Sequence, residues 1–257
     1  MTSWVIHLPH ASTIIPAAVR SELLLSDQEL ALEVLRMTDH LTDDLVAAAL
    51  LSAERVRFSV SRLVLDPERF PIDADEPMSL VGMGVIYERT SQGALLRRPP
   101  SRAVRQQLLE TYYAPHHSAL EKSVATALER HRCCAILDMH SFASRPLPYE
   151  LDQDSDRPDI CIGTDEFHTP ARLADEFMRR FSAEGLTVVL NRPFSGTMVP
   201  LHYFRNDCRV MSIMVEVNRR LYLDEATGKV GERFDHVQSM LARVLKDLAG
   251  LPMVLQT

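Results

Sequence analysis

The sequence predicts an α/β protein with a largely parallel, or mixed, β-sheet, and two observations support this class. Short apolar runs without helical spacing recur along the chain and are typical of buried strands, the clearest being residues 135–142. Segments with helical spacing and capping residues separate these runs, and at the start of one of them Ser26 and Glu29 form a capping-box pattern. Strands that alternate with helices indicate a sheet with helices packed on its faces.

The expected elements follow one another along the whole chain. Strands are expected at residues 4–8, 55–65, 135–142, 159–164, 187–190 and 210–217, with a short one near 85–87. Helices are expected at residues 26–37, 43–52, 101–113, 117–131, 169–184 and 231–248. Pro115 is expected to separate two of these helices, and Thr169 to cap another.

One long segment has few periodic apolar positions. Residues 71–100 are rich in Pro, Gly and acidic residues, and we expect a long excursion there that covers a functional site. No shift in composition marks a domain boundary, so residues 1–257 are expected to form a single domain.

The composition argues against several classes of protein. With a net charge of -7 and an isoelectric point near 5.8, the chain lacks the basic surface that nucleic acids require. No apolar run approaches the roughly 20 residues that span a bilayer, and the first residues lack the pattern of a secretory signal. The four cysteines have no CxxC spacing, which argues against zinc held by sulfur and favours a reducing compartment. We therefore expect a cytoplasmic protein without a nucleic-acid or membrane partner.

Two of the expected strands end at a histidine. Pro9-His10 follows the first strand, and the strand at residues 135–142 contains Asp138 and His140. Open α/β sheets bind ligands outside the carboxyl ends of their strands, where an imidazole can bind a metal and a nearby carboxylate can orient the ring. Taken alone, His140 is equally well explained as a hydrogen-bonded residue at the end of its strand.

A third strand end carries a carboxylate. Glu216 interrupts the apolar run 210–217, and a carboxylate is costly to bury among Val, Met and Ile. Two histidines and one carboxylate are a common ligand set for catalytic zinc, and a carboxylate outside the set can act as general base. Glu216 suits the second role, and an ion pair with Arg219 is the alternative. Asp39 lies shortly after the first strand, either as a metal-capable carboxylate or as a helix cap.

An ordered set of short motifs runs through the chain. It comprises Pro9-His10, Thr38-Asp39, Ser61-Arg62 with Asp66 and Arg69, Pro115-His116-His117, Leu137-Asp138-Met139-His140-Ser141, Pro158-Asp159 with Gly163-Thr164, Pro193-Phe194-Ser195-Gly196, and Glu216-Val217-Asn218-Arg219 with Tyr222. Each motif is weak alone, but the set resembles the N-formylglutamate amidohydrolase family over nearly the whole chain. The resemblance implies a three-layer sandwich around a mixed, largely parallel sheet, as in zinc carboxypeptidases and phosphorylase/hydrolase-like proteins.

The resemblance also implies the composition of the site. It assigns one zinc ion to His10, Asp39 and His140, and the role of general base to Glu216. For the third ligand, His40 and Asp43 are alternatives to Asp39. Since the family acts on an amino-acid dicarboxylate, arginines that bind carboxylates are expected. The candidates for substrate binding are Arg62, Arg69, Asn191, Arg192 and Arg219, and for each arginine a solvated or ion-paired role is the alternative.

The sequence departs from the family in two places. His40-Leu41 stands where the family often has an aromatic residue followed by His, and Glu68 stands where the family commonly has Asn. Both positions lie near the expected substrate contacts, so they bear on the substrate more than on the metal.

Together these residues and the resemblance predict metal-dependent hydrolysis of an N-formyl or related N-acyl acidic amino acid, such as N-formyl-L-glutamate, to formate and the amino acid. One alternative is a zinc hydrolase of another N-acyl amino acid or small peptide. A second, of another class, is a metal-free binding protein on the same fold, although such a protein has no need of a buried base beside two imidazoles. The sequence is compatible with a homo-oligomer and does not set the oligomeric state.

Overall fold

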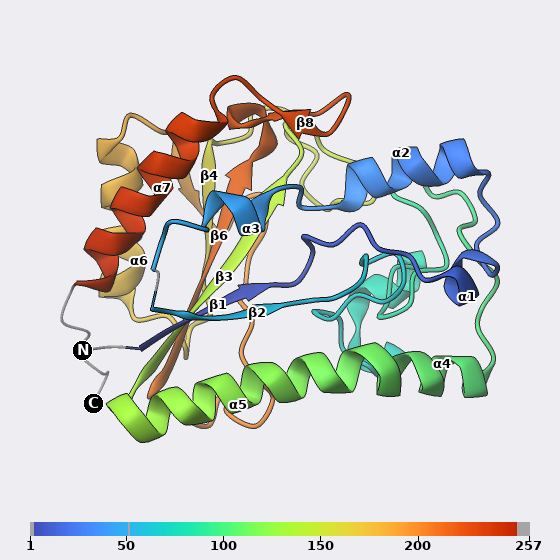
Figure 1. The fold of residues 1–257 in the computed structure, drawn as a ribbon, viewed down its shortest axis with the longest axis horizontal. Coiled ribbons are helices and arrows are strands. Elements are labelled where there is room, and N and C mark those ends of the chain that lie inside the picture. Colours follow the sequence, from blue (N-terminus) through green and yellow to red (C-terminus); the bar gives the residue numbers. More distant parts are fainter. Residues whose placement is uncertain (1–2, 51, 251–257) are drawn as a thin grey trace.

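Six strands form one mixed β-sheet in the computed structural model, which describes residues 3–50 and 52–250 (Figure 1). The strands are β1 (Ser3–Leu8), β2 (Glu54–Arg57), β3 (Cys134–Phe142), β4 (Ile160–Gly163), β5 (Val188–Leu190) and β6 (Val210–Asn218). Their order in the sheet is β2-β1-β3-β6-β4-β5, and each neighbouring pair is parallel except β4 with β6. The predicted mixed, largely parallel sheet is confirmed.

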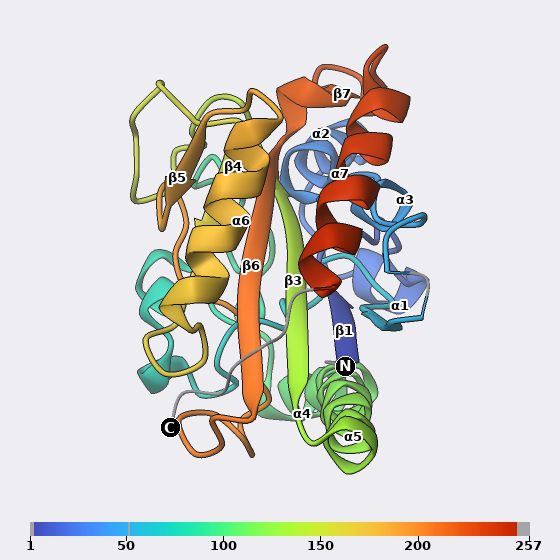
Figure 2. The same cartoon turned by 90° about the vertical axis from the view of Figure 1, so that its left-hand side faces the viewer.

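Helices cover both faces of the sheet and its edges. They are α1 (Ala17–Arg20), α2 (Asp27–Met37), α3 (Thr42–Leu45), α4 (Arg102–Leu108), α5 (Ala114–His131), α6 (Ala171–Ala183) and α7 (Phe234–Ala249). Short 3-10 helices occur at Asp73–Asp75, Pro77–Val81 and Arg219–Leu221, and a separate hairpin is formed by β7 (Leu223–Asp224) and β8 (Lys229–Val230). Figure 2 shows α6 and α7 side by side in front of the sheet, and α5 packs against the opposite face, on β1, β2 and β3. Within the described ranges, no helix is both long and apolar enough to cross a membrane.

Alternate residues of the central strands face different layers. Leu137 of β3 and Ile213 of β6 belong to the core beneath α6 and α7, whereas Ile136 belongs to the core beneath α5. This arrangement confirms the predicted three-layer sandwich. Because side chains alternate along a strand, Asp138 and His140 share the α5 side of the sheet with Ile136.

Two predicted elements are much shorter in the structure. The strand predicted at residues 55–65 pairs with β1 only as far as Arg57; beyond it Phe58 packs with Val85 in a separate apolar cluster. The helix predicted at residues 43–52 is reduced to α3. The Arg55 side chain donates to the carbonyl oxygens that a longer helix would use, those of Val46, Ala47 and Ala49. Residue 51 lies outside the described residues.

Other expectations fail at single positions. Residues 85–87 form no strand, although their side chains are buried in the apolar clusters. Pro115 does not separate two helices: it lies in the first turn of α5, and a π-type turn at Leu109–Tyr113 joins α4 to α5. Thr169 does not cap α6, since its hydroxyl donates to the Ser212 carbonyl oxygen at 2.6 Å. The capping box at Ser26 is present as predicted.

Candidate active site

Strand register brings the polar residues of the central strands together. His140 of β3 lies directly opposite Glu216 of β6, and His7 of β1 lies opposite Asp138 of β3. His10 follows the end of β1, and the Asp39 backbone N–H donates to its carbonyl oxygen at 3.0 Å. The site therefore forms at the carboxyl ends of parallel strands, where open α/β sheets bind ligands.

The imidazoles of His10 and His140 share one carboxylate. Their ring centroids are 5.1 Å apart, and each residue is only 3% exposed. One carboxylate oxygen of Asp39 lies 3.1 Å from Nδ1 of His140 and 3.6 Å from Nδ1 of His10. Burial opposes ionisation of Asp39, but the hydrogen bonds and charges of both histidines hold its pKa well below the usual range. Arg219, which donates to the other Asp39 oxygen at 3.1 Å, balances this buried charge.

The opposite ring nitrogens contact other carboxylates. Nε2 of His10 lies 2.9 Å from Asp66, and Nε2 of His140 lies 3.0 Å from Asp138. A carboxylate that accepts the proton of one ring nitrogen leaves the other nitrogen free to bind a metal. This pattern leaves both Nδ1 atoms, on the side of Asp39, able to bind a metal: Nδ1 of His10 has no hydrogen-bond partner, and that of His140 contacts Asp39.

A second carboxylate approaches the same histidines from the Nε2 side. The Glu68 carboxylate lies 3.3 Å from Nε2 of His140 and 3.6 Å from Nε2 of His10. Ligand atoms of His10, Glu68 and His140 lie close enough to hold one ion, and so do those of His7, Glu68 and Asp138. The site thus offers two carboxylates, Asp39 and Glu68, for one pair of imidazoles.

The donor set suits a divalent cation. Two imidazoles with a carboxylate are preferred ligands of zinc, and buried carboxylates require a positive partner. Burial opposes protonation of His140, yet the carboxylates of Glu68 and Asp138 hold its pKa well above the usual range. Such an excess of negative charge around a buried imidazole is the electrostatic environment that a cation fits.

Glu216 has the properties of a catalytic carboxylate. It is 6% exposed, and burial raises the pKa of its carboxyl to about 8. Its Oε2 atom has no hydrogen-bond partner, and among the ion pairs of the described residues none involves Glu216. Arg219, the expected ion-pair partner, is engaged with Asp39 and with Ser141, to whose hydroxyl it donates at 3.1 Å. The unpaired carboxylate faces the same cavity as both histidines.

That cavity, which we term the catalytic cavity, has a volume of about 160 Å³. It is lined by His10, Asp39, His140 and Glu216, and by four arginines, Arg36, Arg62, Arg69 and Arg219. Arg62 donates to Asp66 at 2.7 Å and to the Tyr87 hydroxyl at 3.1 Å, and the Tyr87 hydroxyl in turn donates to Asp66. Nε of Arg69 is buried without a hydrogen-bond partner, although the guanidinium lies 3.8 Å from both Asp66 and Glu76, so it has donors available to a ligand.

Two of the expected substrate contacts lie elsewhere. Asn191 and Arg192 are exposed and do not line the catalytic cavity. The Asn191 side chain bonds to Thr164, while the guanidinium of Arg192 lies 3.4 Å from Asp154. The segment 71–100, which was expected to cover the site, does not line the catalytic cavity either. Residues from the segment 141–150 line it instead. His40 points away, its Nε2 lying 3.2 Å from the Leu35 carbonyl oxygen, and Asp43 pairs with Arg57.

Sequence reasoning missed the closeness of Glu68 and Asp66 to the histidines. Both belong to the segment that follows Ser61-Arg62, which was expected to supply substrate contacts. The signal available was the run Asp66-Pro67-Glu68-Arg69, in which three charged side chains follow a buried apolar segment. The burial of Asp66 beside Arg62 could have been inferred from that pattern. The direction in which the Glu68 side chain points could not, because it depends on the conformation of the loop that contains it.

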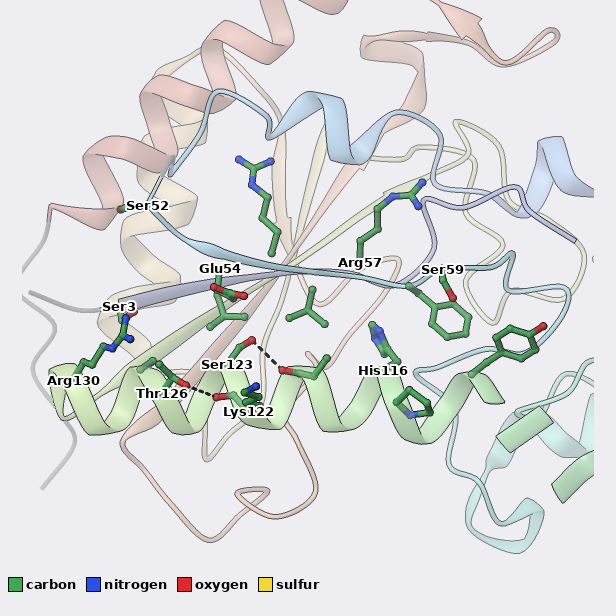
Figure 3. A pocket seen from close by; sticks show the side chains of 18 of the residues that line it. Ser3, Ser52, Glu54, Arg57, Ser59, His116, Lys122, Ser123, Thr126 and Arg130 are labelled. Atoms are coloured by element: carbon green, nitrogen blue, oxygen red, sulfur yellow. Dashed lines mark hydrogen bonds between the residues drawn. The ribbon is translucent and has the colours of Figure 1, made fainter. Parts of the chain in front are cut away.

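A larger cavity of about 560 Å³ lies between β2 and α5, away from these residues. Figure 3 shows Lys122, Ser123 and Thr126 of α5 facing Glu54 of β2, with His116 toward the far end. The Nε2 atom of His116 lies 2.9 Å from that of His7. His10, His140 and Glu216 do not line this cavity, so it is not the candidate active site.

These features define a three-layer α/β protein with a buried histidine–carboxylate site at the ends of its strands. The chain belongs to the N-formylglutamate amidohydrolase family, whose family model matches residues 2–223. It is 28% identical over 229 residues to N-formylglutamate deformylase of Pseudomonas aeruginosa, covering 86% of this chain and 82% of that protein. The resemblance inferred from the motifs is confirmed.

Two solved structures share the fold. The N-formylglutamate amidohydrolase of Ralstonia eutropha JMP134 superposes with a TM-score of 0.84 at 24% identity, over 97% of this chain and 94% of that one. A gene product of Agrobacterium tumefaciens has a TM-score of 0.64 at 18% identity, over 96% and 92% of the two chains. At these identities the likeness establishes the fold alone.

Proposed function

We propose that the protein is a zinc-dependent amidohydrolase that cleaves an N-formyl or related N-acyl acidic amino acid, N-formyl-L-glutamate being the reference substrate. The observation that carries this proposal is the unpaired, buried Glu216 in one cavity with His10 and His140. The Pseudomonas relative, a deformylase of N-formylglutamate, supports the substrate. A cytoplasmic location is part of the same proposal, based on the cysteine spacing.

The ion would be held by Nδ1 of His10, Nδ1 of His140 and the carboxylate of Asp39. Asp66 and Asp138 accept hydrogen bonds from the opposite nitrogens and so fix the ring orientations. Glu68 is the competing carboxylate, because it reaches the Nε2 side of the same rings. When bound, a zinc ion supplies Lewis acidity toward water and toward the amide carbonyl.

The protein's own residues carry the proton transfers and the binding. Glu216 accepts a proton from the attacking water and returns it to the amide nitrogen as the C–N bond breaks, which yields the carboxylic acid and the free amino group. Its raised pKa matches a group that must both accept and release a proton near neutral pH. Arg69 and Arg62 bind the carboxylates of the amino acid, since planar guanidinium groups pair with carboxylates in a bidentate way.

The test combines metal analysis with the Glu216→Gln variant. Protein purified without chelator is expected to contain one zinc per chain and to release formate from N-formyl-L-glutamate. Glu216→Gln is expected to keep the zinc and to lose roughly 10²–10⁴-fold in kcat, because the amide cannot accept the proton. Absence of stoichiometric metal together with no release of formate or of another acid would refute the hydrolase proposal and favour a binding protein, whereas unchanged activity in Glu216→Gln would refute the role of Glu216 as general base.

A further inference from the structure

We propose that a second cavity, next to the catalytic cavity, binds the acyl part of the substrate and selects apolar N-acyl groups larger than formyl. This cavity, which we term the acyl cavity, has a volume of about 320 Å³. The inference rests on the proposed hydrolase function and names the substrate class for it.

The two cavities meet at shared walls. Glu68, Arg69, Ser195 and Met214 line both of them. Met214 precedes Glu216 by two residues on β6, so both side chains point to the same side of the sheet. The acyl cavity therefore begins beside the proposed general base, where the bond to be cleaved would lie.

The walls of the acyl cavity are rich in large apolar side chains. These are Phe70, Tyr113, Met198, Leu201, Phe204 and Met214. They come from four parts of the chain: the loop after Asp66, the π-type turn before α5, the segment before β6, and β6 itself, which supplies Met214. Ligand sites of this kind bind mainly by removing apolar surface from water.

The two cavities differ in how many arginines line them, and this difference suits the charged amino-acid part of the substrate to one cavity and the uncharged acyl part to the other. The catalytic cavity is lined by four arginines, whereas among arginines only Arg69 lines the acyl cavity. Carboxylates line both cavities, Glu68, Asp138 and Asp165 the acyl cavity and Asp39, Asp66, Glu68, Glu150 and Glu216 the catalytic cavity, so the difference lies in the arginines: a substrate carboxylate in the acyl cavity could pair only with Arg69. An acidic amino acid is accordingly held in the catalytic cavity, which directs its uncharged acyl group toward the apolar walls.

A formyl group does not use this space. Its carbonyl carbon carries only a hydrogen, so it extends no atom into the acyl cavity. Each methylene group that moves from water into contact with the apolar walls is expected to raise kcat/KM about fourfold, which is what a typical methylene transfer contributes. The volume leaves room for several such groups.

The first experiment is a kinetic series with the acyl chain as the only variable. The zinc-loaded enzyme is assayed for release of L-glutamate from its N-formyl, N-acetyl, N-butyryl and N-hexanoyl derivatives. We expect kcat/KM to rise from acetyl to hexanoyl by at least tenfold. Hydrolysis of the formyl derivative with a fall of tenfold or more from formyl to hexanoyl would overturn the acyl-cavity proposal and leave the hydrolase intact. If no derivative is cleaved, both proposals fail.

The second experiment removes the apolar wall. Phe70 and Leu201 are 42% and 58% exposed, so the double change Phe70→Ser, Leu201→Ser should leave the core folded. The ratio of kcat/KM for hexanoyl over formyl substrate is expected to fall at least fivefold. Leu80→Ser is the matched control, because Leu80 is also exposed and lines neither cavity. An unchanged ratio in the double variant would overturn the proposal, as would an equal fall in the control.

Discussion

The carboxylates around His10 and His140 differ in which ring nitrogen they contact. Asp39 lies against both Nδ1 atoms and is paired with Arg219, whereas Glu68 lies near both Nε2 atoms and is 20% exposed. The Nε2 atoms already have closer partners in Asp66 and Asp138, which orient the rings. At the scale of single residues, this difference is the reason for proposing Asp39 as the ligand, although the ligand atoms of Glu68 also lie close enough to those of both histidines to share one ion.

This assignment predicts different effects for two similar substitutions. Asp39→Asn removes the proposed ligand charge, and we expect zinc affinity to fall at least 100-fold. Glu68→Gln restores the amide type that the family commonly has there, and we expect zinc affinity to change less than tenfold. Competition with a chromogenic zinc chelator measures both constants. The reverse order of the two variants would show that Glu68, and not Asp39, is the ligand.

A second residue-scale prediction concerns the substrate carboxylates. Nε of Arg69 has no hydrogen-bond partner, and the residue lines both cavities. Arg69→Gln keeps a donor but removes the charge, so KM for N-formyl-L-glutamate is expected to rise roughly 10–150-fold, the effect of losing about 1.5–3 kcal/mol from a charged hydrogen bond.

The control is Arg192→Gln, because Arg192 is exposed, faces Asp154 and lies outside the catalytic cavity. Steady-state kinetics should give it a wild-type KM. A larger rise in KM for Arg192→Gln than for Arg69→Gln would contradict the placement of the substrate.

At the scale of elements, α2 links local sequence to the site. Its capping box satisfies backbone groups at the N-terminus, with the Ser26 hydroxyl accepting from the Glu29 N–H at 3.3 Å. Its last residue, Met37, is 1% exposed, and Asp39 follows after one more residue. The helix thus fixes where the Asp39 carboxylate enters the site.

Removing the cap should weaken this element without touching the cavity. Ser26→Ala is expected to lower the free energy of unfolding by ~1 kcal/mol, because the first turn loses its side-chain acceptor. Urea denaturation followed by circular dichroism measures the change. Ser123→Ala in the middle of α5 is the control, since Ser123 is half-buried, lies far from the cap, and its hydroxyl only donates back to the Ala119 carbonyl oxygen. Equal stability of the two variants would argue against the role of the cap.

The capping box also shows which elements a sequence can predict. It was predictable because its hydrogen bonds join residues three apart, and β3 and β6 were predictable because their apolar runs are long. The lengths of β2 and α3 could not be predicted from the sequence, because each length is set by contacts with residues elsewhere in the fold. Arg55 binds the carbonyl oxygens beyond α3, and Phe58 packs with Val85 instead of continuing the strand.

The same distinction holds for the site. His10, His140 and Glu216 could be proposed because each stands at the end of a predicted strand, and the structure places all three on one cavity. The placement of Asn191 was not predictable: its left-handed backbone, with φ of 54°, turns the chain, and its side chain bonds to Thr164. The approach of Glu68 to both histidines likewise depends on a loop conformation that no periodic pattern encodes.

At the scale of the whole molecule, the site joins parts of the chain that are far apart in sequence. It draws on the ends of β1, β3 and β6, on the residue pair after α2, and on the loop that contains Asp66. Carboxylates from these parts converge in a buried region, so their mutual repulsion opposes the folded state unless a cation offsets it. A ligand that binds only the folded protein stabilises it in proportion to the logarithm of its concentration over Kd.

Removal of the metal should therefore destabilise the entire fold. Zinc at 100 times its Kd contributes about 2.7 kcal/mol, which corresponds to roughly 5–10 °C in Tm for a domain of this size. We expect chelation by EDTA, followed by dialysis, to lower Tm by that amount and added zinc to restore it, as measured by differential scanning calorimetry. Glu216→Gln should retain the shift, because Glu216 is not among the proposed ligands, whereas Asp39→Asn should lose most of it. A Tm that is the same before and after chelation would mean that arginines and protonated histidines alone balance the buried carboxylates, and the proposal of a resident ion would then be withdrawn.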